Sequence, residues 1–266
     1  MMHYSVPFRG VLDATIQRRG LAASSLLFGL LQIALCAGFI IMLVCLFLYF
    51  VEESTYFRVS DIQISGTRGL DVEQIERRAG VALGDNMRGL DVAEAEARLN
   101  AMPRVRQSEV IRHFPNLVTI DIEERIPIAG VQMPNSIAEI DSEGVVVREL
   151  KPHELHVGPL ISAEPGQWIA AVGERIESAR LQAGLDVWRS FAATALAAEM
   201  TVSEIWVREV NDIRMFCDEL PFEIRWGRGD FETQARRLAA LWKERGGELD
   251  CEYYLDLRWG KDVACW

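Results

Sequence analysis

Residues that carry catalytic or metal chemistry are scarce in this chain. Its 266 residues include only four histidines, and no GxSxG, HExxH or P-loop sequence occurs. His153 and His156 form an HxxH pair, but a zinc site needs further ligands. We therefore predict two surface imidazoles there. We also predict no metal, no cofactor and no catalytic residue, so the chain is not expected to be an enzyme.

The cysteines are too few and too irregularly spaced for a disulfide framework or a zinc centre. Cys36 and Cys45 lie in a long apolar run, which leaves Cys217, Cys251 and Cys265 without a CxxC spacing. The last two flank a predicted hairpin but lie about three positions out of register around its turn. We predict buried free thiols, with a bridge between the last two as the alternative.

Charge is absent from one long stretch of the chain. Residues 20–51 contain no charged side chain and include the run LLFGLLQIALCAGFIIMLVCLFLYFV. About 20 apolar residues cross a bilayer, whereas a cleavable signal peptide has a shorter apolar region of roughly 7–15 residues. The sequence therefore predicts one retained transmembrane helix.

The charges that flank this helix predict its orientation. Arg9, Arg18 and Arg19 outweigh Asp13 before it, so the positive-inside rule keeps the N-terminal tail in the cytoplasm and exports the remainder. Without these three arginines and one aspartate, the net charge of −11 becomes −13 for residues 52–266. An acidic exported part favours protein partners over nucleic acid or anionic lipid surfaces.

Residues 57–126 show a β-α-α-β-β order. An alternating strand, FRVSDIQISG, begins the segment. Asp71 and Asp91 then lie where helix N-caps belong, and Glu94 completes a capping-box spacing with the second. Two further strands follow, VRQSEVIRHF and LVTIDIEER. This order predicts two helices packed on one face of a small sheet.

A second, β-rich unit is predicted over residues 127–266. A hairpin formed by IAEID and GVVVRE has Asp141 and Glu143 in its turn, where we expect ordinary solvated carboxylates. The segment HELHVGPLISAEPG is expected to be an ordered loop. A long amphipathic helix is predicted over 171–199 and a shorter one from Asp230. Three short strands lie between the helices: SEIWVREV, IRMFC and PFEIRW.

The fold class is therefore α+β. It comprises a single transmembrane helix, the small β-α-α-β-β unit and a mixed β-sheet unit with two helices.

The tryptophans divide into two groups. Four lie on helical stripes or in central strands and are expected in the core: Trp188, Trp206, Trp226 and Trp242. The last twelve residues, LDLRWGKDVACW, predict two strands joined by a tight turn at Trp259, Gly260 and Lys261, and they end at Trp266. Aromatic side chains beside open backbone groups suit strand addition by a partner. The alternative is that the sheet buries both rings.

Together these parts resemble the FtsQ/DivIB family of bacterial cell-division proteins. The resemblance covers nearly the whole chain and rests on FRVSDIQISG, VRQSEVIRHFPNLVTIDIEERIPIAG, IAEIDSEGVVV, LPFEIRWGRGDFETQARRLAAL and YYLDLRWGKDVACW. It implies a cytoplasmic tail (1–19), a transmembrane helix (20–51), a POTRA domain (57–126) and an FtsQ-type β-domain (127–266). The last two would lie in the periplasm, anchored to the inner membrane at the division septum.

The resemblance implies a structural role. Proteins of this family join FtsB-like and FtsL-like single-span proteins in the divisome and help to control septal wall synthesis, while the POTRA domain serves recruitment. A short FtsB segment pairs as a strand with the C-terminal part of the β-domain. Carried onto this chain, the partner-binding residues are Arg258, Trp259, Gly260, Lys261 and Trp266.

Two other classes of protein stay open as alternatives. POTRA modules also occur in outer-membrane assembly and secretion factors, but those proteins carry a β-barrel and several modules in series, and this sequence predicts neither. A single-pass sensor of a small ligand would need a pocket with convergent polar groups. Co-purification with single-span coiled-coil partners would favour the division protein over the sensor.

Overall fold

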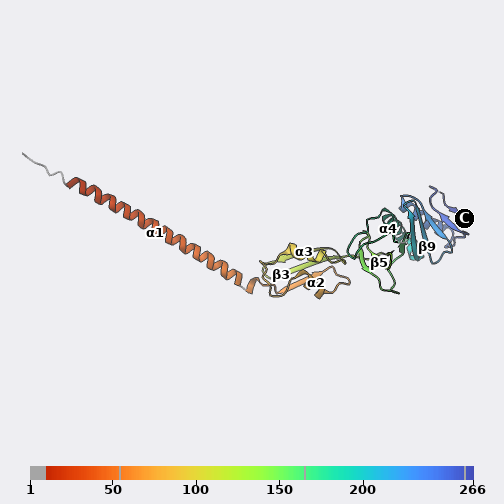
Figure 1. Cartoon of the computed structure of the whole chain (residues 1–266), viewed down its shortest axis with the longest axis horizontal. Coiled ribbons are helices and arrows are strands. Elements are labelled where there is room, and N and C mark those ends of the chain that lie inside the picture. The colour runs from red at the N-terminus through yellow and green to blue at the C-terminus, as the bar shows by residue number, and fades with distance from the viewer. Residues whose placement is uncertain (1–9, 54, 165, 261) are drawn as a thin grey trace, which may run out of the picture.

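The computed structural model of the protein describes residues 10–53, 55–164, 166–260 and 262–266. Figure 1 shows three parts arranged in a line: one long helix, a small sheet with two helices, and a larger sheet whose far end carries the C-terminus. The predicted α+β class, with its single apolar helix, small unit and mixed sheet, is confirmed.

The long helix is α1 (Gly10–Glu53), which begins before the predicted start at residue 20. Its segment Phe28–Phe50 has a mean hydropathy of 2.8, and none of that segment is buried in the protein. At 1.5 Å per residue, 23 helical residues span about 34 Å, enough for the roughly 30 Å hydrocarbon core of a bilayer. This segment indicates a membrane anchor. Of the predicted cytoplasmic tail, residues 1–19, residues 1–9 lie outside the described part of the chain.

The small sheet has the strand order β1-β3-β2, with β1 parallel and β2 antiparallel to β3. In chain order the elements of this unit are η1 (Thr55–Phe57), β1 (Asp61–Ser65), α2 (Val72–Ala79), α3 (Val92–Asn100), β2 (Val105–His113) and β3 (Leu117–Glu124). The two predicted N-caps are confirmed, because Asp71 accepts a bond from the Glu73 N–H and Asp91 from the Glu94 N–H. The alternating residues of β3 bury one face of the sheet: Val118, Ile120 and Ile122.

The large sheet has the order β12-β11-β10-β9-β8-β7-β4-β5-β6. Its unit comprises β4 (Ala129–Gln132), β5 (Ile137–Ile140), β6 (Val146–Glu149), β7 (Leu160–Ser162), α4 (Ala179–Ala192), η2 (Ala195–Ala198), β8 (Val202–Glu209), β9 (Asp212–Cys217), β10 (Glu223–Trp226), α5 (Phe231–Glu244), β11 (Tyr254–Asp256) and β12 (Ala264–Cys265).

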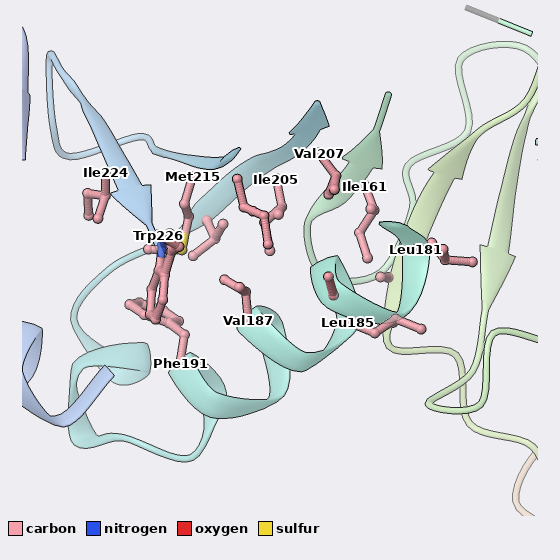
Figure 2. Packing of buried hydrophobic residues seen from close by; sticks show 14 of the residues in the cluster. Ile161, Leu181, Leu185, Val187, Phe191, Ile205, Val207, Met215, Ile224 and Trp226 are labelled. Atoms are coloured by element: carbon pink, nitrogen blue, oxygen red, sulfur yellow. The ribbon is translucent and has the colours of Figure 1, made fainter. Parts of the chain in front are cut away.

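The core of this unit lies between α4 and the sheet. In Figure 2, Val187 and Phe191 of α4 lie on the side of Trp226, while Leu185 lies beside Leu181 nearer the start of the helix. Full burial of one such aliphatic side chain contributes about 1.5–3 kcal/mol. These contacts hold the strands of the large sheet against one helix.

Two predicted elements of this unit were wrong. The expected loop contains β7, which lies between β4 and β8 and runs parallel to both. Three residues are too short to show alternation, so the neighbouring strands alone define this strand. The helix predicted over 171–199 begins only after Ser178, whose side chain accepts a bond from the Leu181 N–H, and it ends at Ala192. The residues before it bind β6 instead.

The tryptophans only partly follow the prediction. Trp226 is fully buried, as predicted, while Trp188 and Trp242 are half-buried at the margin of the core. Trp206 is also half-buried, and the guanidinium of Arg214 lies over its ring at 4.9 Å from the centroid. Its strand, β8, buries the residues on either side of it, so Trp206 faces away from α4. The core prediction was therefore wrong for Trp206.

The predicted solvated carboxylate at Asp141 was also wrong. This side chain is buried, with one oxygen accepting bonds from the N–H groups of Glu143 and Val145, each at 2.9 Å. Its other oxygen accepts a 2.5 Å bond from Nη1 of Arg125, a residue that follows β3 of the small sheet. A charge from the other unit therefore compensates the burial, which a local turn pattern does not reveal.

A second arginine also crosses between the two units. Arg106 of β2 donates to Glu143 from Nε at 3.1 Å and from Nη2 at 2.6 Å, and it also bonds Glu123 of β3. The hydrogen bonds from Arg106, together with those from Arg125, hold the pKa of the Glu143 carboxyl below its ordinary value. Ionic contacts therefore join the small sheet to the first hairpin of the large sheet.

We predict that Asp141→Asn destabilises the protein, because it leaves the largely buried Arg125 guanidinium without its main counter-charge. Removing one partner of a buried ion pair costs about 3–5 kcal/mol. Urea unfolding of the full chain, followed by circular dichroism, measures the change. Glu73→Gln, which breaks an exposed pair with Arg77, is the control and should cost less than about 1 kcal/mol. Equal losses in the two variants would contradict the buried-pair interpretation.

Candidate partner-binding edge

The two ends of the large sheet differ in how their backbone groups are used. At one end, the chain itself covers β6: Gly173 donates its N–H to the Val146 carbonyl at 2.7 Å, and Val146 donates to Glu174 at 2.9 Å. At the other end lies β12, which pairs with β11 alone in the described part of the chain. The open edge is therefore at the C-terminal end of the sheet.

Pairing between β11 and β12 determines which groups face outward. Trp266 donates its N–H to the Tyr254 carbonyl at 3.0 Å, and its own carbonyl accepts from the Tyr254 N–H at 3.2 Å. Residues 254 and 266 are thus a hydrogen-bonded pair, and such pairs alternate with non-bonded ones in an antiparallel ladder. The next pair, Leu255 with Cys265, is non-bonded. The N–H and carbonyl of Cys265 therefore point away from the sheet.

A disulfide joins Cys251 to Cys265, so the prediction of free thiols was wrong for these two residues. Residue 251 precedes β11, and the chain from 251 to 253 is not part of that strand. The Cα atoms come within 5.2 Å because the chain folds back there. Counting positions along an extended hairpin does not capture that path. Cys217 is free and buried as predicted, and burial raises the pKa of its thiol to about 12.

The connection between β11 and β12 is longer than the predicted tight turn and is held from α5. Arg237 donates from Nη2 to the Leu257 carbonyl at 2.9 Å and from Nη1 to the carbonyls of Gly260 and Asp262. Gly260 has a φ of 58°, in the left-handed region that favours glycine. Lys261, predicted as a partner residue, lies outside the described residues. Arg237 positions this loop from 20 or more residues away along the chain, so no local sequence pattern predicts its role.

Arg258 is bound to Asp256 rather than extended into solvent. Its Nε lies 2.9 Å and its Nη2 2.6 Å from the two carboxylate oxygens, and its backbone N–H donates to the same carboxylate at 3.0 Å. Burial alone would raise the pKa of the Asp256 carboxyl. The hydrogen bonds and the charge of Arg258 outweigh that effect and hold the pKa below its ordinary value. This pair stiffens the residues that lead into the loop.

Aromatic side chains surround the open edge. Trp259 and Trp266 are 64% and 66% exposed, so the alternative that the sheet buries both is wrong. The Trp266 ring stacks on Tyr254 at 6.4 Å between centroids, and the Arg225 guanidinium lies 3.6 Å from the Tyr254 centroid. Tyr253, which was not among the predicted partner residues, is a further exposed aromatic residue, at 64%.

A cavity of about 330 Å³ lies beside β12. Its lining combines apolar side chains from α5 and the terminal strands with a polar rim, and comprises Leu241, Arg245, Glu248, Leu249, Asp250, Leu255, Val263 and Cys265. An open edge with an adjacent apolar pocket has both elements of strand addition: backbone groups for affinity and a side-chain pocket for specificity.

Elsewhere in the described chain, no group of three or more His, Cys, Asp or Glu side chains is placed to hold a metal ion.

The chain matches two family models. The description "POTRA domain, FtsQ-type" covers residues 57–125, and "Cell division protein FtsQ/DivIB, C-terminal" covers residues 129–258. The second match ends at Arg258. The open edge therefore lies beyond the matched range, together with four of the five predicted partner residues.

Curated relatives match over most of their length. The cell division protein FtsQ of Geotalea daltonii is 26% identical over 258 residues, which cover 97% of this chain and 89% of that protein. The cell division protein FtsQ of Streptomyces coelicolor is 29% identical over 196 residues, covering 71% of this chain and 72% of that protein. That of Myxococcus fulvus is 26% identical over 207 residues, covering 73% and 66%.

We predict that the disulfide stabilises the terminal edge. Replacing Cys251 and Cys265 by alanine should lower the free energy of unfolding by about 3 kcal/mol, the value for a closed loop of about 15 residues. Urea unfolding of the full chain with and without a phosphine reductant measures it. The reductant should shift the wild-type midpoint and leave that of the double variant unchanged. A wild-type midpoint that ignores the reductant would refute the stabilising role.

We predict a pH-dependent contribution from Asp256. Because its pKa is lower in the folded than in the unfolded chain, its contribution is full above the unfolded pKa and is lost as the pH falls through the folded one. The stability difference between wild type and Asp256→Asn should therefore shrink between about pH 5 and about pH 3. Urea unfolding across this range measures it. A difference that stays constant would show that the charge of Asp256 does not matter.

Proposed function

Because this chain belongs to the FtsQ/DivIB family of cell-division proteins, we propose that it is a divisome scaffold that receives a strand of an FtsB-like partner on the outer edge of β12. The observation that carries the proposal is the open edge at the end of the large sheet, with Trp259 and Trp266 exposed beside it. Its action is binding rather than catalysis.

The proposed placement follows from the helix and its flanking charges. Residues 1–19 form the cytoplasmic tail, and residues 20–51 anchor the chain in the inner membrane at the septum. The POTRA domain (57–126) and the β-domain (127–266) lie in the periplasm. The positive-inside rule supports this orientation, since three arginines precede the apolar segment. The linear arrangement in Figure 1 then carries β12 away from the membrane, toward the exported part of a single-span partner.

The partner strand would pair with the outward N–H and carbonyl of Cys265. Main-chain bonds of this kind give affinity without selecting a sequence, so selection falls to side chains. The cavity beside β12 would accept one apolar side chain of the partner, and the two tryptophan rings would cover the added strand. Arg258 and Gly260 contribute indirectly, because the first is held by Asp256 and the second shapes the loop.

The wider role follows from the family. FtsB-like and FtsL-like proteins would join the scaffold as one complex that helps to coordinate septal wall synthesis, while the POTRA domain engages other divisome proteins. Both matching family models are of FtsQ type, which favours this function over a secretion factor or a small-ligand sensor.

The test is capture of the purified FtsB-like protein of the same organism by the full chain in nanodiscs. Truncation of an aromatic anchor at an interface costs about 2 kcal/mol or more, so Trp259→Ala should weaken capture by at least about tenfold. Deleting residues 262–266, which removes β12, should abolish it. Leu155→Ala, which truncates a side chain that is 88% exposed away from the edge, is the matched control.

Undiminished capture by both edge variants, with native circular dichroism, would overturn the proposed edge. The binding surface would then have to lie on the POTRA domain or the membrane helix. Loss of capture by Leu155→Ala to the same degree would show that the assay responds to any change of the surface.

A further inference from the structure

The end of the small sheet that adjoins α1 exposes apolar side chains to solvent. Tyr56, Leu83 and Phe114 are 65%, 67% and 58% exposed. They come from three separate segments: η1, the loop between α2 and α3, and the hairpin tip between β2 and β3. We call these three residues, together with Arg58, Arg88 and Arg112, the membrane-facing patch.

Short contacts bring these segments together. The Phe57 ring lies 5.3 Å from that of Tyr56 and 6.5 Å from that of Phe114, measured between centroids. Met87 donates its N–H to the Phe57 carbonyl at 2.9 Å, and Gly84 donates to Val59 at 2.8 Å. The loop that carries Leu83 and the hairpin tip that carries Phe114 therefore flank the first residues after the helix.

The same end carries unpaired positive charge. Arg58, Arg88 and Arg112 are exposed, and none of them forms an ion pair with a described residue. Arg58 and Arg112 donate instead to backbone carbonyls, at 3.1 Å to Gly84 and at 3.1 Å to Leu90 respectively. Their charge is therefore not neutralised within the described chain.

The net charge of residues 52–266 does not describe the charge at this end of the small sheet. The −13 of residues 52–266 disfavours anionic surfaces on average. Near the three arginines, Glu52 and Glu53 end α1 and Asp61 begins β1, but no ion pair joins a described side chain to any of these arginines. In the loop over 82–90 the acidic residue is Asp85, whose carboxylate accepts a 2.8 Å bond from the Ala82 N–H. Uncompensated arginines around exposed apolar side chains are the composition of a surface that lies against a membrane interface.

The chain between the anchor and the patch is short. The apolar segment ends at Phe50, and the residue before it, Tyr49, is of a type enriched at membrane interfaces. Three further helical residues and three more to Tyr56 span at most about 15 Å. The interfacial layer on each side of the hydrocarbon core is about 5–8 Å thick. The membrane-facing patch is therefore tethered within reach of that layer.

We propose that the small sheet rests on the bilayer through this patch, with Leu83 and Phe114 inserted at the level of the headgroups and the three arginines on lipid phosphates. This second contact with the membrane would limit the rotation of the exported part about the short connection after α1. It depends on the membrane anchor and does not involve the partner edge, so each proposal can fail without the other.

The test measures the depth of single spin labels on the full chain in nanodiscs, one of neutral phosphatidylcholine and one with added phosphatidylglycerol. Labels are attached at Leu83→Cys or Phe114→Cys, with Cys36 and Cys45 replaced by alanine. Cys217 stays, because its buried thiol is unreactive. A label at Leu155→Cys in the large-sheet unit is the matched control for exposure.

We expect the labels at residues 83 and 114 to be relaxed several-fold more by membrane-soluble oxygen, relative to a water-soluble nickel chelate, than the label at residue 155. Contact in anionic nanodiscs alone would also support the patch, with the arginines as the main attraction. Ratios equal to that at residue 155 in both lipids would overturn the proposal.

A second variant separates insertion from mere proximity. Leu83→Glu changes an exposed side chain, so it should fold normally while making headgroup insertion unfavourable. The label at residue 114 should then become more accessible to the nickel chelate. If that accessibility stays unchanged, Leu83 takes no part in holding the sheet on the membrane, and the proposed two-point insertion is wrong.

Discussion

One buried carboxylate, that of Asp141, joins the two sheet units that follow the long helix. It closes the first hairpin of the large sheet through two backbone N–H groups and accepts a charged bond from Arg125, which follows the last strand of the small sheet. An unpaired charge in such a site would be costly, so the hairpin and the small sheet are each needed to satisfy the other. Together with the Arg106–Glu143 pair, this contact joins the small sheet to the large sheet, which lies on its far side from α1 (Figure 1).

The two ends of the large sheet differ in how their strand edges are covered. An exposed strand edge invites pairing with other chains, and proteins usually cover it. Here the segment before α4 covers β6, whereas in the described part of the chain β12 pairs with β11 alone and is tied to the chain around β11 by a disulfide and by the stacking of Trp266 on Tyr254. If the proposed partner strand binds this edge, its rigidity lowers the entropy cost of binding.

Arginine has two different uses in this acidic chain. Arg125 and Arg258 neutralise the buried carboxylates of Asp141 and Asp256. At the end next to α1, Arg58, Arg88 and Arg112 form no ion pair with a described residue and lie near exposed apolar side chains instead. The net charge of the chain sums over both groups of arginines, so it does not reveal the group next to α1. The distinction depends on which carboxylates fold next to which arginines, and these are far apart in sequence.

Local patterns determined much of this protein. A charge-free run of membrane length, N-caps at Asp71 and Asp91, and alternation in β3 each depend on neighbours within a few residues, and sequence alone predicted them correctly. What only the tertiary structure decided are contacts between distant segments. The three-residue strand β7 exists because two strands flank it, Asp141 is buried because Arg125 reaches it, and Cys251 meets Cys265 because the chain folds back before β11. The path of the chain creates these environments, and residue spacing does not encode that path.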